Sequence, residues 1–116
     1  MSPRVLIAEP DDELRATYQR YLTRRGCTVG LASTLAELRE KAMSFLPDAI
    51  VTELDFPDGR FDDDGLLLGG EMGTVVVLAS RRSQDGVGDA IRARVRAGFV
   101  KPFKMVRLFA ALTNSG

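Results

Sequence analysis

Acidic side chains and one lysine follow the short apolar runs of this sequence, at the points where predicted strands would end. The residues concerned are Glu9, Asp11, Glu53, Asp55 and Lys101. Residues 48–59 show the pattern best, because a β-branched apolar run leads into Glu53 and then into a proline and a glycine. Open α/β sheets bind their ligands at the carboxyl ends of their strands. These positions therefore predict a cleft in which carboxylates and an ammonium group lie together.

Histidine and cysteine chemistry is almost absent from the sequence. The chain has no histidine, which removes the Ser-His and Cys-His nucleophiles together with the usual zinc ligand. Cys27 is the single cysteine, so a disulfide framework and a thiolate cluster are excluded as well, and we expect Cys27 to be a packing residue. The common hydrolase mechanisms are therefore excluded.

Five short strands and the helices between them are predicted to position the acids and the lysine. Apolar runs predict strands at residues 5–8, 27–31, the start of 48–59, 74–79 and 99–100. Helical spacing of apolar residues predicts helices over residues 14–22, 35–45, 87–95 and 105–112, whereas residues 66–70 leave room only for a third helix that is short or absent. A capping box at residues 34–37 marks the start of the second helix.

The alternation of strands and helices predicts an α/β fold with a parallel sheet covered on both faces. For five strands the doubly wound order 2-1-3-4-5 is the expected arrangement, with a crevice at the ends of the first and third strands. The acids that follow those strands, and Lys101 after the fifth, would share this crevice.

Length and composition predict one globular domain, spanning residues 1–116, which can be the N-terminal domain of a longer protein. With 45% apolar and 28% charged residues, no membrane-spanning run and no signal-peptide pattern, we expect a cytoplasmic protein. The charges are unevenly distributed: residues 1–71 hold 14 acids and 8 bases, and residues 72–116 hold 2 acids and 8 bases. Such asymmetry indicates either a partner-binding surface or solvated helix faces of opposite sign.

The order of these elements resembles the response-regulator receiver domain, over essentially the whole chain. The resemblance is carried by Val-Leu-Ile-Ala-Glu at residues 5–9, Pro-Asp-Ala-Ile-Val-Thr-Glu at 47–53 and Lys-Pro-Phe at 101–103. In that family an aspartate at the end of the third strand accepts a phosphoryl group from a histidine kinase. Magnesium is held by that aspartate and by acids after the first strand, and a hydroxyl residue and the lysine bind the phosphoryl oxygens. The resemblance also implies a cis Lys101–Pro102 bond.

Several positions depart from the family's pattern. Glu53 occupies the phosphoacceptor position, and Pro10 stands where the principal metal-binding aspartate is expected, between Glu9 and Asp11. Ala79 replaces the phosphate-sensing hydroxyl residue, and Gly98 replaces the switch aromatic three residues before the lysine. Lys101 and Glu9 match the pattern.

These departures predict a pseudo-receiver, a signalling module of two-component systems that does not run the phosphorylation cycle. We expect no catalytic residue, no enzymatic activity, no cofactor and no metal, and we expect Glu53 to pair with Lys101 as a fixed charge. An alternative is an active switch that uses Asp55 as a displaced acceptor with Mg²⁺. A small-molecule sensor at the crevice is another alternative. Asp11 can either replace the lost metal ligand or cap the first helix.

The resemblance also implies a protein-binding face formed by the fourth helix, the fifth strand and the closing helix. The candidate residues on this face are Arg92, Arg94, Arg96, Phe103, Lys104 and Arg107. A second copy of the chain is one candidate partner. No nucleic-acid-binding signature accompanies the arginines, so we expect neither direct nucleic-acid binding nor membrane association.

Overall fold

The computed structural model describes residues 2–61, 75–81 and 95–113. Its central element is a five-stranded parallel sheet with the strand order β2-β1-β3-β6-β7. The strands of this sheet are β1 (Arg4–Ala8), β2 (Thr28–Ala32), β3 (Ala49–Thr52), β6 (Val75–Ser80) and β7 (Val95–Val100). The doubly wound order predicted from the sequence is therefore confirmed.

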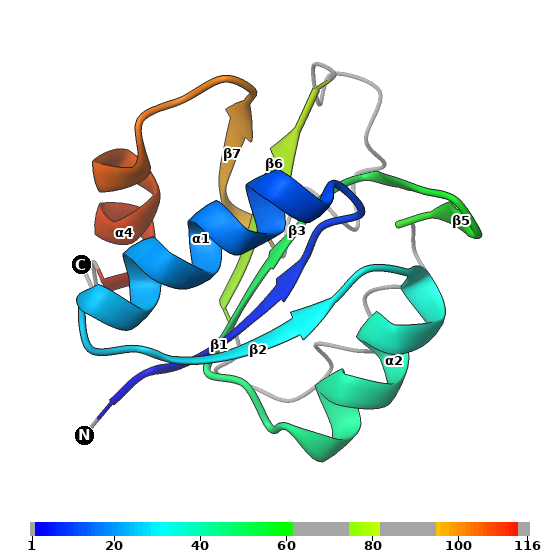
Figure 1. Ribbon diagram of the computed structural model, residues 1–116, viewed down its shortest axis with the longest axis horizontal. Coiled ribbons are helices and arrows are strands. Elements are labelled where there is room, and N and C mark those ends of the chain that lie inside the picture. Colours follow the sequence, from blue (N-terminus) through cyan, green and yellow to red (C-terminus); the bar gives the residue numbers. More distant parts are fainter. Residues whose placement is uncertain (1, 62–74, 82–94, 114–116) are drawn as a thin grey trace.

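Three described helices cover the two faces of the sheet, as Figure 1 shows. They are α1 (Asp12–Arg24), α2 (Leu35–Ser44) and α4 (Met105–Thr113). Helices α1 and α4 lie side by side on one face, and α2 lies on the other. No helix in the described part of the chain is long and apolar enough to span a membrane.

The strands β1, β3 and β6 form the buried centre of the sheet, because both of their faces are covered. Alternate side chains of each strand point to opposite faces. Leu6, Ile50 and Val76 pack with α2, whereas Ile7, Val51 and Val77 pack with α1 and α4. This double burial explains why the sequence shows continuous apolar runs at these strands.

The starts of α1 and α2 are capped by side chains. The Asp11 side chain accepts a hydrogen bond from the Leu14 backbone N–H at 2.9 Å, and Thr34 accepts one from Glu37 at 3.1 Å. Glu37 in turn accepts from the Ser33 backbone N–H at 2.9 Å, one residue before the position that a strict capping box uses. Asp11 is therefore the cap of α1.

The sequence-based prediction was wrong at the fifth strand, which is six residues long instead of two. Val95, predicted to end the fourth helix, is the first residue of β7 and pairs with Val76. Residues 95–100 alternate between partly buried and exposed positions, which is the period-2 pattern of a strand with one covered face. The remainder of the fourth helix and the short third helix were predicted for residues that lie outside the described part of the chain.

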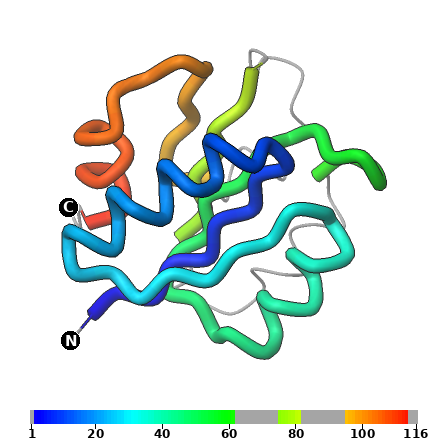
Figure 2. The backbone as a smooth tube through the Cα atoms, viewed as in Figure 1, coloured from blue at the N-terminus to red at the C-terminus, as the bar shows by residue number. Residues whose placement is uncertain are grey.

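A two-stranded hairpin follows β3, where the sequence indicates only a turn and a loop. Its strands are β4 (Asp55–Phe56) and β5 (Gly59–Arg60), and they pair antiparallel across the turn residues Pro57 and Asp58. In Figure 2 this hairpin projects from the end of the central sheet, above the start of α2. Gly59 has φ +145°, in the region that L-residues with side chains rarely adopt, so a glycine is required there.

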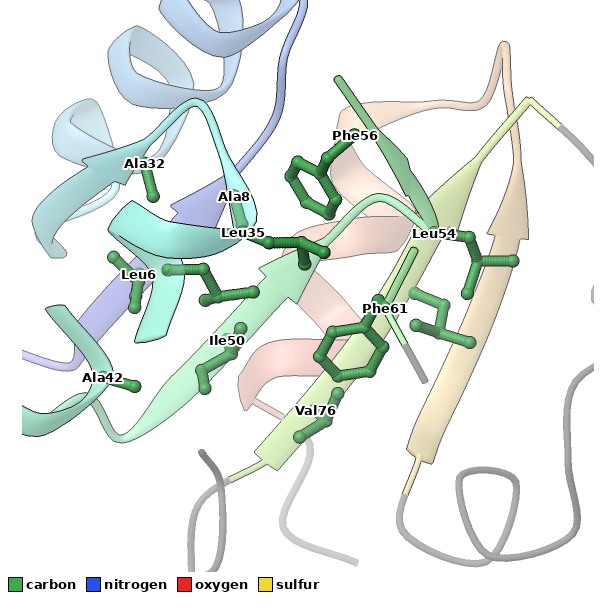
Figure 3. Close-up of a cluster of buried hydrophobic side chains, with 12 residues drawn as sticks. Leu6, Ala8, Ala32, Leu35, Ala42, Ile50, Leu54, Phe56, Phe61 and Val76 are labelled. Carbon is green, nitrogen blue, oxygen red and sulfur yellow. The ribbon is translucent and has the colours of Figure 1, made fainter. Parts of the chain in front are cut away.

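The hairpin is anchored to the α2 face by apolar side chains and by one carboxylate. Figure 3 shows Leu35 of α2 close to Phe56 and Phe61, in the same buried cluster as Leu54. The Asp58 carboxylate accepts hydrogen bonds from the backbone N–H groups of Leu35 and Ala36, at 2.9 and 3.0 Å. These contacts fix the loop that immediately follows the acid at position 53.

Candidate functional site

Three of the predicted site residues are each the first residue after a strand. Glu9 follows β1, Glu53 follows β3 and Lys101 follows β7. Each backbone is fixed by one further sheet-like hydrogen bond: Glu9 N to Ala32 O at 2.9 Å, Glu53 N to Ala8 O at 3.0 Å, and Lys101 N to Ser80 O at 2.8 Å. The sheet thus brings residues that are far apart in sequence to one edge.

Lys101 lies between the two glutamates. Its Nζ is 2.5 Å from Glu9 Oε1 and 2.9 Å from Glu53 Oε1. The side chains are nearly inaccessible, with exposed fractions of 10% for Lys101, 2% for Glu9 and 5% for Glu53. The expected contact between Glu53 and Lys101 is therefore present, and Glu9 completes a buried cluster of three charges.

The remaining oxygens of the two glutamates accept hydrogen bonds from the backbone. Glu9 Oε2 accepts from the Asp11 N–H at 3.0 Å. Glu53 Oε2 accepts from the N–H groups of Leu54 and Asp55, at 2.5 and 3.2 Å. All four carboxylate oxygens of the cluster thus have a donor.

The environment of Glu53 favours its charged form. Burial raises the pKa of the Glu53 carboxyl, but hydrogen bonds from Lys101, Ser80 and Leu54 outweigh burial, so the pKa lies below its usual value. Glu53 is therefore a fixed negative charge at neutral pH.

Ser80 is a site residue that the sequence reasoning missed. The hydroxyl position was assigned to Ala79, whose buried side chain packs in the core against α1 and α4. Ser80, the next residue, is fully buried at the end of β6, and its side chain hydrogen-bonds to Glu53. The only sequence signal for it was the serine itself, one residue beyond the expected position.

The other predicted acids lie around the opening of the site. Asp11 caps α1, and its second oxygen is 3.7 Å from the exposed guanidinium of Arg81. Asp55 is exposed at the start of β4, two residues after Glu53, and its backbone N–H contacts the Glu53 carboxylate at 3.2 Å. A crevice of about 440 Å³ above the cluster is lined by Glu9, Pro10, Asp11, Glu53, Asp55 and Arg81.

A buried tyrosine lies beside the charged cluster on the α1 face. Tyr18 is 1% exposed, and its hydroxyl has no hydrogen-bond partner within the described residues. Burial, together with the charges of Glu9 and Glu53, raises the pKa of the Tyr18 phenol. The Tyr18 ring stacks on Phe103, with ring centroids 6.2 Å apart.

A groove on the surface of β7 and α4 contains most of the described residues of the predicted partner face. The groove has a volume of about 470 Å³ and is lined by Gly98, Phe99, Val100, Pro102, Phe103, Lys104 and Arg107. Phe99 stacks on Phe103 at 5.0 Å, and the Arg107 guanidinium lies 6.0 Å from the Phe99 ring. Phe99, one residue after Gly98, therefore supplies an aromatic ring close to the expected switch position.

Other predictions for this face have mixed outcomes. Arg96 is exposed on β7, whereas Arg92 and Arg94 lie outside the described residues. The Lys101–Pro102 bond is cis, as the resemblance implies.

The described residues contain no group of three or more Asp, Glu, Cys or His side chains placed to hold a metal ion. Mg²⁺ requires near-octahedral oxygen ligands at about 2.0–2.1 Å. The carboxylate oxygens of Glu9 and Glu53 instead accept from an ammonium group and from backbone N–H groups, and Pro10 has no side-chain oxygen. The residues present therefore do not fit the metal that the resemblance implies.

Comparison with solved structures places the fold among receiver domains. The non-phosphorylated HemR receiver domain from Leptospira biflexa is similar over 99% of this chain and 98% of its own, with a TM-score of 0.80 and 22% identity. A two-component response regulator from Clostridium difficile covers 98% of both chains, with a TM-score of 0.86 and 19% identity. These matches define a CheY-like receiver fold.

Sequence comparison supports the same class. The transcriptional regulatory proteins PrrA of Mycobacterium leprae and Mycobacterium tuberculosis are each 33% identical over 111 residues, which is 94% of this chain and 48% of the relative. No family model matches the sequence. The chain thus has the receiver fold and is similar in sequence to response regulators, and it spans about half the length of the curated relatives it matches.

Proposed function

We propose that this chain is a pseudo-receiver, a two-component signalling module that acts through protein contacts without accepting a phosphoryl group. The observation that carries the proposal is the position and environment of Glu53. A glutamate follows β3, and both of its oxygens are bound by Lys101 and by backbone N–H groups.

Geometry supports the loss of phosphoryl acceptance. Phosphoryl transfer depends on in-line positioning, and a displacement of about 1 Å can cost on the order of a hundredfold in rate. Glutamate is longer than aspartate by one methylene group. Pro10 also removes a carboxylate from the loop after β1. Both changes act against the same reaction.

The groove on β7 and α4 is the surface that we propose for partner proteins. It combines two stacked aromatic rings, Phe99 and Phe103, with the cationic side chains of Lys104 and Arg107. Val100 and Val106 on the same two elements are 50% and 56% exposed. Exposed apolar groups with a cationic rim suit an acidic protein surface, including that of a second copy of this chain.

Incubation with a small phosphoryl donor and Mg²⁺, followed by intact-mass measurement, tests the proposal. We expect no phosphoryl adduct on the wild-type chain. The matched variants are Glu53→Asp and the double variant Pro10→Asp with Glu53→Asp, which restores the carboxylates that the family pattern requires. We expect an adduct on the double variant.

A stable one-phosphoryl adduct on the wild-type chain would overturn the proposal. Its loss in Asp55→Asn would then assign the acceptor to Asp55. A metabolite that raises the melting temperature of the wild type, but not that of Asp55→Asn, would instead support a small-molecule sensor at the crevice.

The partner surface is tested with charge reversal. We expect Arg107→Glu to weaken self-association or partner binding, measured by sedimentation velocity. Arg39→Glu is the matched control, because Arg39 is exposed on α2, across the sheet from the groove. Equal effects of the two variants would argue against this groove.

A further inference from the structure

One ammonium group joins the ends of three strands. Glu9 extends β1, Glu53 extends β3 and Lys101 extends β7, and the lysine contacts both carboxylates at 2.5 and 2.9 Å. β7 is at the edge of the sheet and β6 lies between it and β3, so the contact from Lys101 reaches across the end of β6. The ammonium group thus fixes the spacing of strand ends that are not neighbours.

The two buried carboxylates beside Lys101 need a positive charge between them. Two buried carboxylates without a cation between them would repel each other, and burial would make their charged forms costly. Lys101 supplies one positive charge between them, while the N–H groups of Asp11, Leu54 and Asp55 satisfy the outer oxygens. The carboxylates therefore have no free oxygen directed at a further cation.

Asp11 and Asp55 are the other acids that line the opening, and neither of them is without a partner. Asp11 binds the N-terminus of α1 and lies 3.7 Å from Arg81, and Pro10 contributes no carboxylate. A divalent ion would have to displace the lysine, and it would find two carboxylates instead of an octahedral set. The structure thus disagrees with the metal dependence that the fold family implies.

We infer that the Lys101 ammonium is the resident cation of this site and holds the carboxyl ends of β1, β3 and β7 together without a metal ion. This inference rests on the proposed function and deepens it. It assigns Lys101 as the cation that occupies the site between the two carboxylates when no phosphoryl group is present. It also predicts a specific consequence. Removal of the ammonium group, with the two glutamates retained, leaves a dianionic pair that attracts divalent cations.

Mn²⁺ is a suitable probe, because it prefers the same oxygen ligands as Mg²⁺ and broadens the NMR signals of nearby nuclei. It is titrated into the wild type, Lys101→Met and the control Lys104→Met, which removes an exposed ammonium group from the groove. The amide signals of Asp11, Leu54 and Asp55 are followed, because these N–H groups contact the two carboxylates.

We expect no selective broadening of these signals in the wild type or in Lys104→Met. In Lys101→Met we expect selective broadening and Mn²⁺ affinity higher on the order of tenfold or more, because the site's net charge becomes more negative by one. Thermal melting gives an independent reading: Mg²⁺ and a chelator should leave the wild-type melting temperature unchanged, and Mg²⁺ should raise that of Lys101→Met.

Selective broadening in the wild type, equal to that in Lys101→Met, would overturn the inference. If Lys101→Met does not fold, the Mn²⁺ titration of the wild type still tests the inference. Broadening of the Leu54 and Asp55 signals that is abolished in Glu9→Gln would contradict a resident ammonium group. No such broadening in the wild type would support one. Metal binding without a phosphoryl adduct would overturn this inference alone. A phosphoryl adduct would overturn the proposed function.

Discussion

The charged cluster at the strand ends and the groove on β7 and α4 differ in what they leave available. In the cluster, Lys101 and both glutamates are almost completely buried, and every carboxylate oxygen has a donor. In the groove, aromatic rings and two cationic side chains line an open surface. The cluster is a fixed arrangement without a free carboxylate oxygen, whereas the groove presents groups that a partner can contact.

We therefore expect the cluster to contribute mainly to the stability of the domain and the groove mainly to the binding of a partner. β7 and its continuation link the two, because Lys101 belongs to the cluster and Pro102 and Phe103 belong to the groove. Variants matched between the two regions can therefore separate stability from association.

The largest difference in stability is expected between two lysine-to-methionine variants, one in the cluster and one in the groove. Lys101→Met leaves two buried carboxylates without their cation, and breaking a buried ion pair costs about 3–5 kcal/mol in free energy of unfolding. Lys104→Met removes an exposed charge and should change that free energy by no more than about 0.5 kcal/mol. Urea denaturation of both variants measures the difference, and equal losses would remove the contrast.

A second comparison uses two residues of α4. Leu108 is fully buried against the sheet, so Leu108→Ala should cost about 2–5 kcal/mol in free energy of unfolding. Val106 is 56% exposed, and Val106→Ala should remain within about 0.5 kcal/mol. Denaturant unfolding gives the stabilities, and sedimentation velocity shows whether Val106→Ala alters association. A large loss of stability in Val106→Ala would show that the outer face of α4 is packed against other residues and is not a free surface.

The pH dependence of stability tests the charge of Glu53. Its folded-state pKa is lowered from 4.5, so its ionisation stabilises the native state above about that pH, and the contribution is lost as the pH falls through the folded-state pKa. Glu53→Gln lacks this contribution. The stability difference between wild type and Glu53→Gln, from urea midpoints, should be largest at neutral pH and shrink below pH 4.5. A difference that is independent of pH would argue against a buried carboxylate.

A smaller effect is expected at the hairpin that follows Glu53. Hydrogen bonds from the N–H groups of Leu35 and Ala36 lower the pKa of the Asp58 carboxyl. Asp58→Asn should therefore lower the melting temperature at neutral pH, and the difference should vanish in acid. Glu40→Gln, an exposed change on α2, is the control for a general charge effect. An equal shift in both variants would show that the carboxylate contact is not specific.

The sequence predicted the parts of the fold that depend on periodicity. The central strands are continuous apolar runs because both of their faces are buried, and their order follows from the alternation of strands and helices. The length of β7 was missed, because its arginine and glycine positions resemble a polar helix end. The β4–β5 hairpin was missed because its strands are two residues long and its stability comes from contacts with α2.

The sequence predicted which charged residues of the candidate site lie together, but it did not predict the hydrogen bonds that hold them. Charge and strand order sufficed to bring Glu53 and Lys101 together. The hydrogen bonds from Leu54 and Asp55 depend on the path of the backbone after β3, which no residue type specifies. Ser80 was missed because the hydroxyl was sought at position 79, whose side chain points into the core against α1 and α4.

The two tyrosines of α1 give the unmodified protein an optical probe. The chain has no tryptophan, and both of its tyrosines, Tyr18 and Tyr21, lie on α1 with buried hydroxyls that have no partner within the described residues. The Tyr18 ring stacks on Phe103, which lines the groove, and the charges of Glu9 and Glu53 raise the pKa of its phenol. Ultraviolet absorbance and emission of the native chain therefore report on one helix, so that occupation of the groove or rearrangement of the cluster can be followed without a label.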